Sequence, residues 1–265
     1  MTLNSSGFGW ISLTTDYGRS DAFAAALHGV IARTAPTVRV IDVTHEVRPG
    51  DVTRGAAVLA QTVPYLPESV HVAVVDPGVG TARRAIALGT PSGLLVGPDN
   101  GLLIAAADAL GGITDAIELT NAAWHGERVS ATFHGRDIFA PVASRLSLGA
   151  PLSDAGDAVA VGDLVRLPPP IVTRGEGYLE AEVLTVDRFG NVQLAATADD
   201  LARLGTHVTV GGMRAVRTTT FGEAPPGSLI VFGDSAGHAA VAINGGRAVV
   251  ALGLEPGDVI RVATL

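Results

Sequence analysis

The chain has 265 residues, 47% of them hydrophobic, which is enough for one large domain or two modest ones with packed cores. Its 18 basic and 26 acidic residues give a net charge of −8 and only 5% of residues are aromatic, so nucleic acid is not an expected partner. The absence of cysteine excludes disulfides, thiolate metal ligands and a cysteine nucleophile.

The N-terminal segment, residues 1–10, differs from a secretory leader because no basic residue precedes an apolar core. No apolar run reaches the ~18 to 20 residues that a membrane-spanning helix needs. We therefore expect a protein of the cytoplasm without a membrane partner.

The first 150 residues alternate apolar runs with helix-like stretches. Strand-like runs lie at 10–13, 38–43 and 70–75. A helix-like stretch spans 21–33, and further helices are expected to begin near Asp51, Gly101 and Arg136. This alternation is typical of βαβ units and predicts an α/β domain with a largely parallel sheet flanked by helices.

A segment rich in proline and glycine then breaks the pattern. The three consecutive prolines at 168–170 stop both a helix and a central strand, and glycines follow. We place a linker at 168–177, between a first domain at 1–167 and a second domain at 178–265.

The second domain consists of short β-rich runs divided by Gly, Asn and Pro turns. These runs lie at 178–187, 207–210, 228–232, 239–243, 248–252 and 258–262. The pattern predicts a small all-β, barrel-like or sandwich domain with one short helix near 199–204.

Three polar segments stand beside apolar stretches in the first domain: T14-T-D-Y-G18, D76-P-G-V-G-T-A-R-R84 and F133-H-G-R-D137. In an α/β fold, strand ends of this kind meet at one edge of the sheet, where ligands bind. Together the segments supply two carboxylates, an arginine and a histidine to one pocket. That combination predicts an enzyme that acts on a small polar molecule.

Further segments, G97-P-D-N-G-L-L103, D187-R-F-G-N191 and N244-G-G-R-A248, follow in order. With this ordered set, the chain resembles the S-adenosylmethionine hydroxide adenosyltransferases, the hydrolase relatives of the fluorinases and chlorinases, over nearly its whole length. The resemblance implies attack of water or hydroxide on the ribose C5′ of S-adenosylmethionine, which releases L-methionine and adenosine. S-adenosylmethionine is then the substrate, and no cofactor is expected.

The resemblance also implies an architecture. An α/β domain binds the nucleoside and carries the catalytic residues, and a C-terminal β-barrel completes the substrate site. The expected assembly is a homotrimer whose active sites lie between the first domain of one subunit and the second domain of its neighbour.

Asp76, Arg83 and His134 match the catalytic triad of the hydroxide-using branch, with Asp76 also in contact with substrate. The sulfonium leaves as a neutral thioether and needs no general acid, so the site must orient a water and accept its proton. Arg83 stays protonated and is expected to hold Asp76 and the water. Either His134 or Asp76 accepts the proton, and the sequence does not decide between them.

The matching motifs also supply substrate contacts. Asp16 matches a carboxylate that binds the ribose diol, and its alternative role is to cap the turn into the helix near Asp21. Asp187 and Asn191 match residues that meet the methionine ammonium and the adenine edge, and their alternative role is a β-turn.

The methionine carboxylate is expected at Ser235, where the resemblance to the family weakens. The family hydrolases often have an Asn-Ser pair there, followed by an aromatic-Leu-Glu run that this chain lacks. Asp234 precedes Ser235 instead and adds a negative charge that weakens binding of a carboxylate.

Other polar residues are read as structural. The D42-V-T-H-E46 cluster is metal-like in composition but lacks a third partner at ligand spacing, so no metal site is expected. D99-N-G101 is interpreted as a turn before a helix. Four histidines lie outside the matching motifs and need no functional explanation: His28, His71, His125 and His207.

Two alternatives stay open. Halide-using relatives have tyrosine in place of the triad aspartate, and this chain has Gly135 where fluorinases have a halide-binding serine; a carboxylate at Asp76 would also repel an anion. A non-catalytic protein that binds S-adenosylmethionine or adenosine would need Asp16 and Asn191 but not the triad. The preferred stereochemistry at sulfur is undetermined, and clearance of an unwanted stereoisomer is one hypothesis for the biological role.

Overall fold

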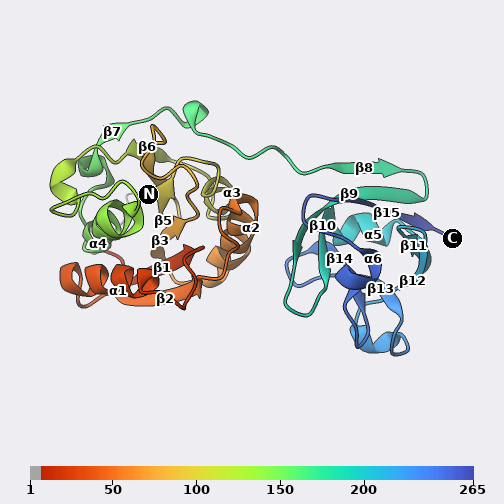
Figure 1. The fold of residues 1–265 in the computed structure, drawn as a ribbon. Helices are drawn as coiled ribbons and strands as arrows, with labels where there is room; N and C mark the ends of the chain where they lie inside the picture. The colour runs from red at the N-terminus through yellow and green to blue at the C-terminus, as the bar shows by residue number, and fades with distance from the viewer. Residues whose placement is uncertain (1–6) are drawn as a thin grey trace. The chain divides into compact units, whose positions relative to one another are not determined.

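The computed structural model describes residues 7–265, which form two compact units, one ending at Leu167 and the other spanning Pro168–Leu265 (Figure 1). Residues 1–6 lie outside the described residues, so most of the segment that we expected to lack a leader is not covered. None of the helices within 7–265 has the length and apolar character to cross a bilayer.

The first unit contains a seven-stranded sheet in the order β2-β1-β3-β5-β4-β6-β7. Its strands are β1 (Trp10–Thr15), β2 (Arg39–Thr44), β3 (Ser69–Val74), β4 (Ala85–Thr90), β5 (Gly93–Pro98), β6 (Asp115–Glu118) and β7 (Asp157–Ala158). β2, β1, β3 and β5 run parallel, whereas β4, β6 and β7 extend the sheet with antiparallel pairs. The expected α/β class is confirmed, and the parallel part of the sheet is the half that carries β1 and β3.

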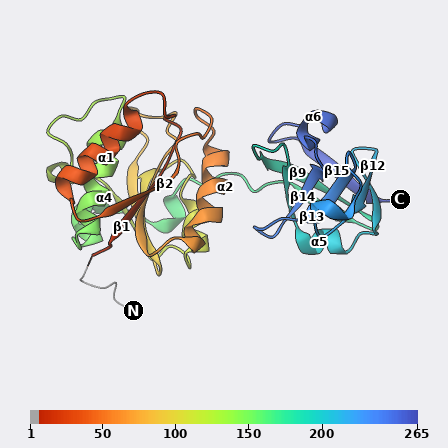
Figure 2. The same ribbon diagram turned by 90° about the horizontal axis from the view of Figure 1, so that it is seen from below.

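Helices cover both faces of this sheet (Figures 1 and 2). α1 (Phe23–Thr34) packs against α4 (Ala140–Ser147), and α2 (Val52–Thr62) packs against α3 (Ile104–Ala109) on the opposite face. Short 3₁₀ turns lie at Val63–Tyr65, Ala122–Trp124, Leu152–Ala155 and Val161–Asp163, and a π-helical turn spans Gly135–Phe139.

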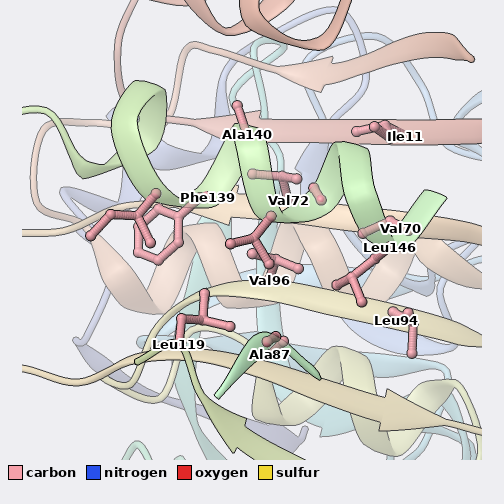
Figure 3. Packing of buried hydrophobic residues seen from close by; sticks show 14 of the residues in the cluster. Ile11, Val70, Val72, Ala87, Leu94, Val96, Leu119, Phe139, Ala140 and Leu146 are labelled. Atoms are coloured by element: carbon pink, nitrogen blue, oxygen red, sulfur yellow. The ribbon is translucent and has the colours of Figure 1, made fainter. Parts of the chain in front are cut away.

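Each face has its own hydrophobic core. Under α1 and α4, the fully buried Phe139 and Leu146 pack on strand residues that include Val72 and Val96 (Figure 3). On the other face, α2 buries Leu59 in a separate cluster. The central strands β1, β3 and β5 are therefore covered on both sides, as their apolar sequences require.

The connections around β1 create an opening at one edge of the sheet. The chain passes from β1 to β2 through α1 on one face and from β2 to β3 through α2 on the other face. β1 and β3 are neighbours, and the chain continues from β1 to β2 on one side but from β3 past β5 to β4 on the other side, so their carboxyl ends form a topological switch point, the usual place for a ligand in such folds.

The second unit is a closed barrel of seven strands. They are β9 (Tyr178–Val186), β10 (Val192–Thr197), β11 (His207–Val210), β12 (Met213–Arg217), β13 (Leu229–Gly233), β14 (His238–Ile243) and β15 (Val259–Thr264). The ring runs β10-β14-β13-β12-β11-β15-β9, and pairing of β9 with β10 closes it. β8 (Val172–Gly175), from the segment expected to be a linker, pairs with β9 outside the ring. The expected barrel-like class is confirmed.

Two short helices, α5 (Ala198–Ala202) and α6 (Ala248–Leu252), lie on opposite sides of the barrel (Figure 2). α5 is the helix expected near 199–204. The strand prediction for 248–252 is wrong, because this run is α6, ended by Gly253 in the left-handed conformation (φ 63°). An apolar run of five residues is too short for its periodicity to distinguish helix from strand.

Candidate active site

Two carboxylates stand at the switch point. Asp16 follows β1 directly and Asp76 follows β3 by two residues. The two strands are paired in parallel, and the backbone N–H of Asp16 donates to the carbonyl of Val74 over 3.4 Å. Strand pairing thus places both acidic residues at the same edge of the sheet.

A tight loop between β3 and β4 brings Arg83 back onto Asp76. Within it, Val79 N–H donates to the Asp76 carbonyl (3.2 Å) and the Thr81 hydroxyl donates to the Gly78 carbonyl (2.7 Å). Arg83 then binds Asp76 with both arms of its guanidinium, Nε to Oδ1 at 3.0 Å and Nη2 to Oδ2 at 2.5 Å. The side chains are only 8% and 6% exposed, so this bidentate pair is shielded from solvent.

His134 completes the group. Its Nδ1 lies 3.0 Å from Nη2 of Arg83. Because a guanidinium only donates hydrogen bonds, Nδ1 must be the acceptor, and the ring proton is on Nε2. Burial and the charge of Arg83 both lower the pKa of His134 below its usual range, so the imidazole is neutral at pH 7. The structure thus joins the three residues of the predicted triad in one hydrogen-bonded group.

One nitrogen of the Arg83 guanidinium does not take part in the contacts of the triad. Nη1 of Arg83 is buried and has no hydrogen-bond partner within residues 7–265. The Arg83 guanidinium carbon lies 5.6 Å from the ring centroid of Phe139, a fully buried core residue. A cation fixed in this way by an aromatic ring and a carboxylate is well placed to hold a water or an anionic oxygen.

Asp16 is held by the loop that precedes α2. Its Oδ2 accepts from the backbone N–H of Gly50 at 2.9 Å. Burial raises the pKa of Asp16, and the nearby charge of Asp76 adds to the effect. No side chain caps α1, whose N-cap residue is Ala22, so the alternative capping role for Asp16 is not the one that the structure shows.

Tyr17, Phe23 and Phe133 form a cluster of aromatic rings beside Asp16 that the sequence analysis does not predict. The Tyr17 ring lies 5.9 Å from that of Phe23 and 5.6 Å from that of Phe133, centroid to centroid. Its hydroxyl touches the backbone of Gly135, where an added Cβ would lie 2.2 Å from the oxygen. Burial and the charges of Asp16 and Asp76 raise the pKa of Tyr17, which stays a phenol. The only signal in the sequence was adjacency to Asp16.

In the barrel, Asp187 organises a turn. Its Oδ1 accepts from the backbone N–H groups of Phe189 and Asn191, each at 2.9 Å, and its Oδ2 accepts from Asn191 Nδ2 at 2.8 Å. The turn role that we weighed for these residues is therefore present. Asn191 also lines a cavity of about 470 Å³ together with Phe189, Phe221, Ile243, Gly245, Gly246 and Arg247.

Ser235 lies exposed in the turn between β13 and β14. The side chain of the neighbouring Asp234 is hydrogen-bonded within the barrel. Its Oδ1 accepts from the backbone N–H groups of Ala236 and His238 (2.9 Å each), and its Oδ2 accepts from Gln193 Nε2 (2.6 Å). The Asp234 carboxylate thus accepts three hydrogen bonds from neutral groups, which fix its position in the turn and leave its negative charge beside Ser235.

The prediction that the 42–46 cluster lacks a third ligand is wrong. His28 of α1, Asp42 of β2 and His45 offer ligand atoms that all lie within 4.8 Å of one another. The sequence concealed this because His28 is on a helix 14 residues before Asp42 and reaches it only when α1 packs beside β2.

Together, these observations describe a two-domain protein with a hydrogen-bonded group of Asp76, Arg83 and His134 at the switch point of its α/β unit and a small cavity on its barrel. The chain belongs to the SAM hydroxide adenosyltransferase family, whose N-terminal domain matches residues 11–156 and whose C-terminal domain matches residues 181–261.

Named relatives agree with this membership. The (R)-S-adenosyl-L-methionine hydrolase of Salinispora arenicola is 67% identical over 96% of this chain and 97% of its own length. The protein of the same name from Thermus thermophilus is 44% identical over 94% of this chain and 97% of its own length. Fluorinases are more distant, at 26–28% identity. The crystal structure of an uncharacterized conserved protein from Thermotoga maritima superimposes with a TM-score of 0.87 at 36% identity, covering 96% of this chain and 99% of that one.

Proposed function

We propose that this chain hydrolyses (R)-S-adenosyl-L-methionine to adenosine and L-methionine. The observation that carries the proposal is the buried, hydrogen-bonded group of Asp76, Arg83 and His134 at the switch point. The 67% identity to a hydrolase of that name supports the substrate and its stereochemistry. We propose clearance of this stereoisomer as the biological role.

The reaction is an in-line displacement at the ribose C5′. A lone pair of a water oxygen forms the C5′–O bond while the C5′–S bond breaks, and its electron pair returns to sulfur as the neutral thioether of methionine. The leaving group needs no acid and no cofactor. Since the attacking water becomes an oxonium as the new bond forms, its proton becomes acidic late in the reaction and a weak base is sufficient.

Asp76 is the base that we propose. Nδ1 of His134 is already used as an acceptor from Arg83, so the imidazole offers the water an N–H donor at Nε2 and not a lone pair. The carboxylate of Asp76 accepts two hydrogen bonds from Arg83 and has lone pairs to spare. The proton released by the water passes to Asp76 and then to solvent, while Arg83 and His134 orient the oxygen.

The substrate is bound from both units. On the first unit, Asp16 accepts from the ribose hydroxyls through the oxygen lone pairs that Gly50 leaves free. On the second, the cavity beside Asn191 takes the adenine, whose edge pairs a donor with an acceptor as an amide does. Asp187 receives the methionine ammonium while it holds the Asn191 amide, and Ser235 receives the carboxylate.

Because the proposed contacts are divided between two units, we propose a homotrimer in which each site uses the first unit of one subunit and the second unit of its neighbour. The division of Asp16, Asp76 and His134 from Asn191 and Ser235 supports this arrangement. We propose the cytoplasm as its location, which cell fractionation tests.

A halide nucleophile is disfavoured by the site. The carboxylate of Asp76 would repel an anion beside it, although its two contacts with Arg83 offset part of that repulsion. Purely passive binding would have no use for a buried Asp–Arg–His group.

The test is chromatography of products from each sulfonium diastereomer, in chloride buffer made with oxygen-18 water. The expected products are methionine and adenosine labelled at its 5′ oxygen. Asp76→Asn should slow turnover by about 10² to 10⁴-fold, and a matched control at an exposed carboxylate of α3, Asp108→Asn, should not. Formation of 5′-chloro-5′-deoxyadenosine would mean a halogenase, and bound but unchanged substrate would mean a binding protein; either result overturns the proposal.

A further inference from the structure

We propose that His28, Asp42 and His45 form a binding site for a divalent first-row transition metal ion, separate from the catalytic triad. Two imidazoles and one carboxylate bind such ions in preference to magnesium or calcium, which favour sets of oxygen ligands. No step of the proposed hydrolysis uses these residues.

The spacing of the donor atoms fits coordination. Nε2 of His28 lies 2.8 Å and Nε2 of His45 lies 3.0 Å from the same oxygen, Oδ1 of Asp42. For metal–ligand bonds of about 2.1 Å, adjacent ligands at right angles are about 3 Å apart. The third separation, between the two histidines, is within 4.8 Å, so one ion can meet all three atoms with small side-chain movements.

A second observation points to a missing ligand. His45 is only 2% exposed, and within residues 7–265 its Nε2 makes no hydrogen bond of normal geometry, with Oδ1 of Asp42 3.0 Å away. Leaving a buried ring nitrogen unpaired is costly. Its other nitrogen, Nδ1, is 2.8 Å from the Thr15 hydroxyl. Metal-binding histidines are commonly oriented by such a second hydrogen bond, which fixes the tautomer with the free lone pair toward the ion.

The site is open to solvent on its other side. The side chains of His28 and Asp42 are 38% and 34% exposed, and β2 is an edge strand of the sheet, so an ion can enter and keep water ligands. β1 separates β2 from β3, the strand that leads to Asp76, so the two sites lie about 10 Å apart by strand spacing alone.

Occupancy would brace the turn that holds Asp16. The carbonyl of His45 accepts from Gly18 N–H at 2.7 Å, and Val47 N–H donates to the Thr15 carbonyl at 3.3 Å. An ion bound to His45 therefore ties α1 and β2 to the segment on either side of Asp16. A rise in the melting temperature of the first unit is expected.

The test is titration calorimetry of the full chain, stripped with a chelator, with Zn²⁺, together with visible absorption on adding Co²⁺. One ion should bind per chain, with the d–d bands of a site containing nitrogen ligands, and Mg²⁺ should not compete. His28→Gln and Asp42→Asn, both at partly exposed positions, should each weaken binding at least tenfold, while His207→Gln, an exposed histidine of the barrel, should not.

Zn²⁺ affinity equal in wild type and His28→Gln, or no binding below millimolar concentration, would overturn the metal site. These experiments measure metal binding and not turnover. Absence of metal binding would therefore not contradict the proposed hydrolase activity, and absence of hydrolase activity would not contradict the metal site.

Discussion

Nη2 of Arg83 donates to Nδ1 of His134 over 3.0 Å while the same guanidinium binds both oxygens of Asp76. Since Nδ1 accepts only when it carries no proton, this link exists only with a neutral imidazole. Protonation of His134 would place a second cation against Arg83 and break the group apart.

The pH dependence of turnover should report this link. Burial and Arg83 lower the pKa of His134, so the neutral, active form prevails at pH 7 and is lost only as the pH falls below ~6.5. In His134→Gln, whose amide oxygen can still accept from Arg83, kcat/KM should be lower but should lose this acid limb. The measurement is kcat/KM from pH 4.5 to 8 for both proteins. An acid limb with the same midpoint in both would show that another group titrates.

Gly135 and Tyr17 should behave as a coupled pair. A Cβ at position 135 would lie 2.2 Å from the Tyr17 hydroxyl oxygen but 3.1 Å from the ring carbon behind it. Gly135→Ala should therefore destabilise the first unit by about 1–3 kcal/mol and impair turnover. Adding Tyr17→Phe should recover most of the loss, because it removes the clashing oxygen.

A double-mutant cycle of urea unfolding free energies measures the coupling. Additive effects of the two substitutions would rule out the contact. The same clash bears on halide use: Gly135→Ser alone should yield an unstable hydrolase and no 5′-chloro-5′-deoxyadenosine, since the serine must first displace Tyr17.

The part of this site that depends on strand order and residue type could be predicted from the sequence. Parallel strands end at a common edge, so Asp16 after β1 and Asp76 after β3 were predictable neighbours. The loop that returns Arg83 to Asp76 is short and local. The resemblance to a family supplied His134, which comes from a helix start 58 residues beyond Asp76 along the chain.

Contacts that arise only when separate elements pack together could not be predicted from the sequence. The distance from the Tyr17 hydroxyl to Gly135 depends on how the π-helical turn after His134 lies against the β1 loop, and no local pattern encodes it. His28 meets Asp42 for the same kind of reason, through the packing of α1 beside β2. In the barrel, the apolar run at 248–252 forms α6 and not the predicted strand, because five residues are too few to distinguish the two periods.

A buried histidine should give the first unit a pH-dependent stability. His71 on β3 is 1% exposed, bonds Ser12 through Nδ1 at 2.8 Å, and has a pKa lowered by burial to about 4. Between pH ~6.5 and 4, the unfolded chain takes up a proton that the folded chain refuses, so stability falls as the pH falls, by about 1.4 kcal/mol per unit and about 3 kcal/mol in total.

His71→Gln, which cannot titrate, should remove this part of the slope, and the control His207→Gln should not. Tryptophan fluorescence during urea unfolding isolates the first unit, because both tryptophans, Trp10 and Trp124, lie in it. An unchanged slope between pH 6.5 and 4 would mean that His71 is protonated in the folded state.

Mixed oligomers would decide whether the two halves of the site come from different subunits. Asp76→Asn damages only the first unit and Asn191→Ala only the second, and each protein alone should turn over poorly. If each site joins the first unit of one subunit to the second unit of the next, a cyclic trimer that contains both variants has one fully native site, since one junction pairs an intact Asp76 with an intact Asn191. Co-expression with two different tags, purification through both and light scattering should give trimers with about one third of wild-type turnover. Turnover no higher than the mean of the two parent variants would mean instead that each site is built within a single chain, and a mass other than three chains would exclude the trimer itself.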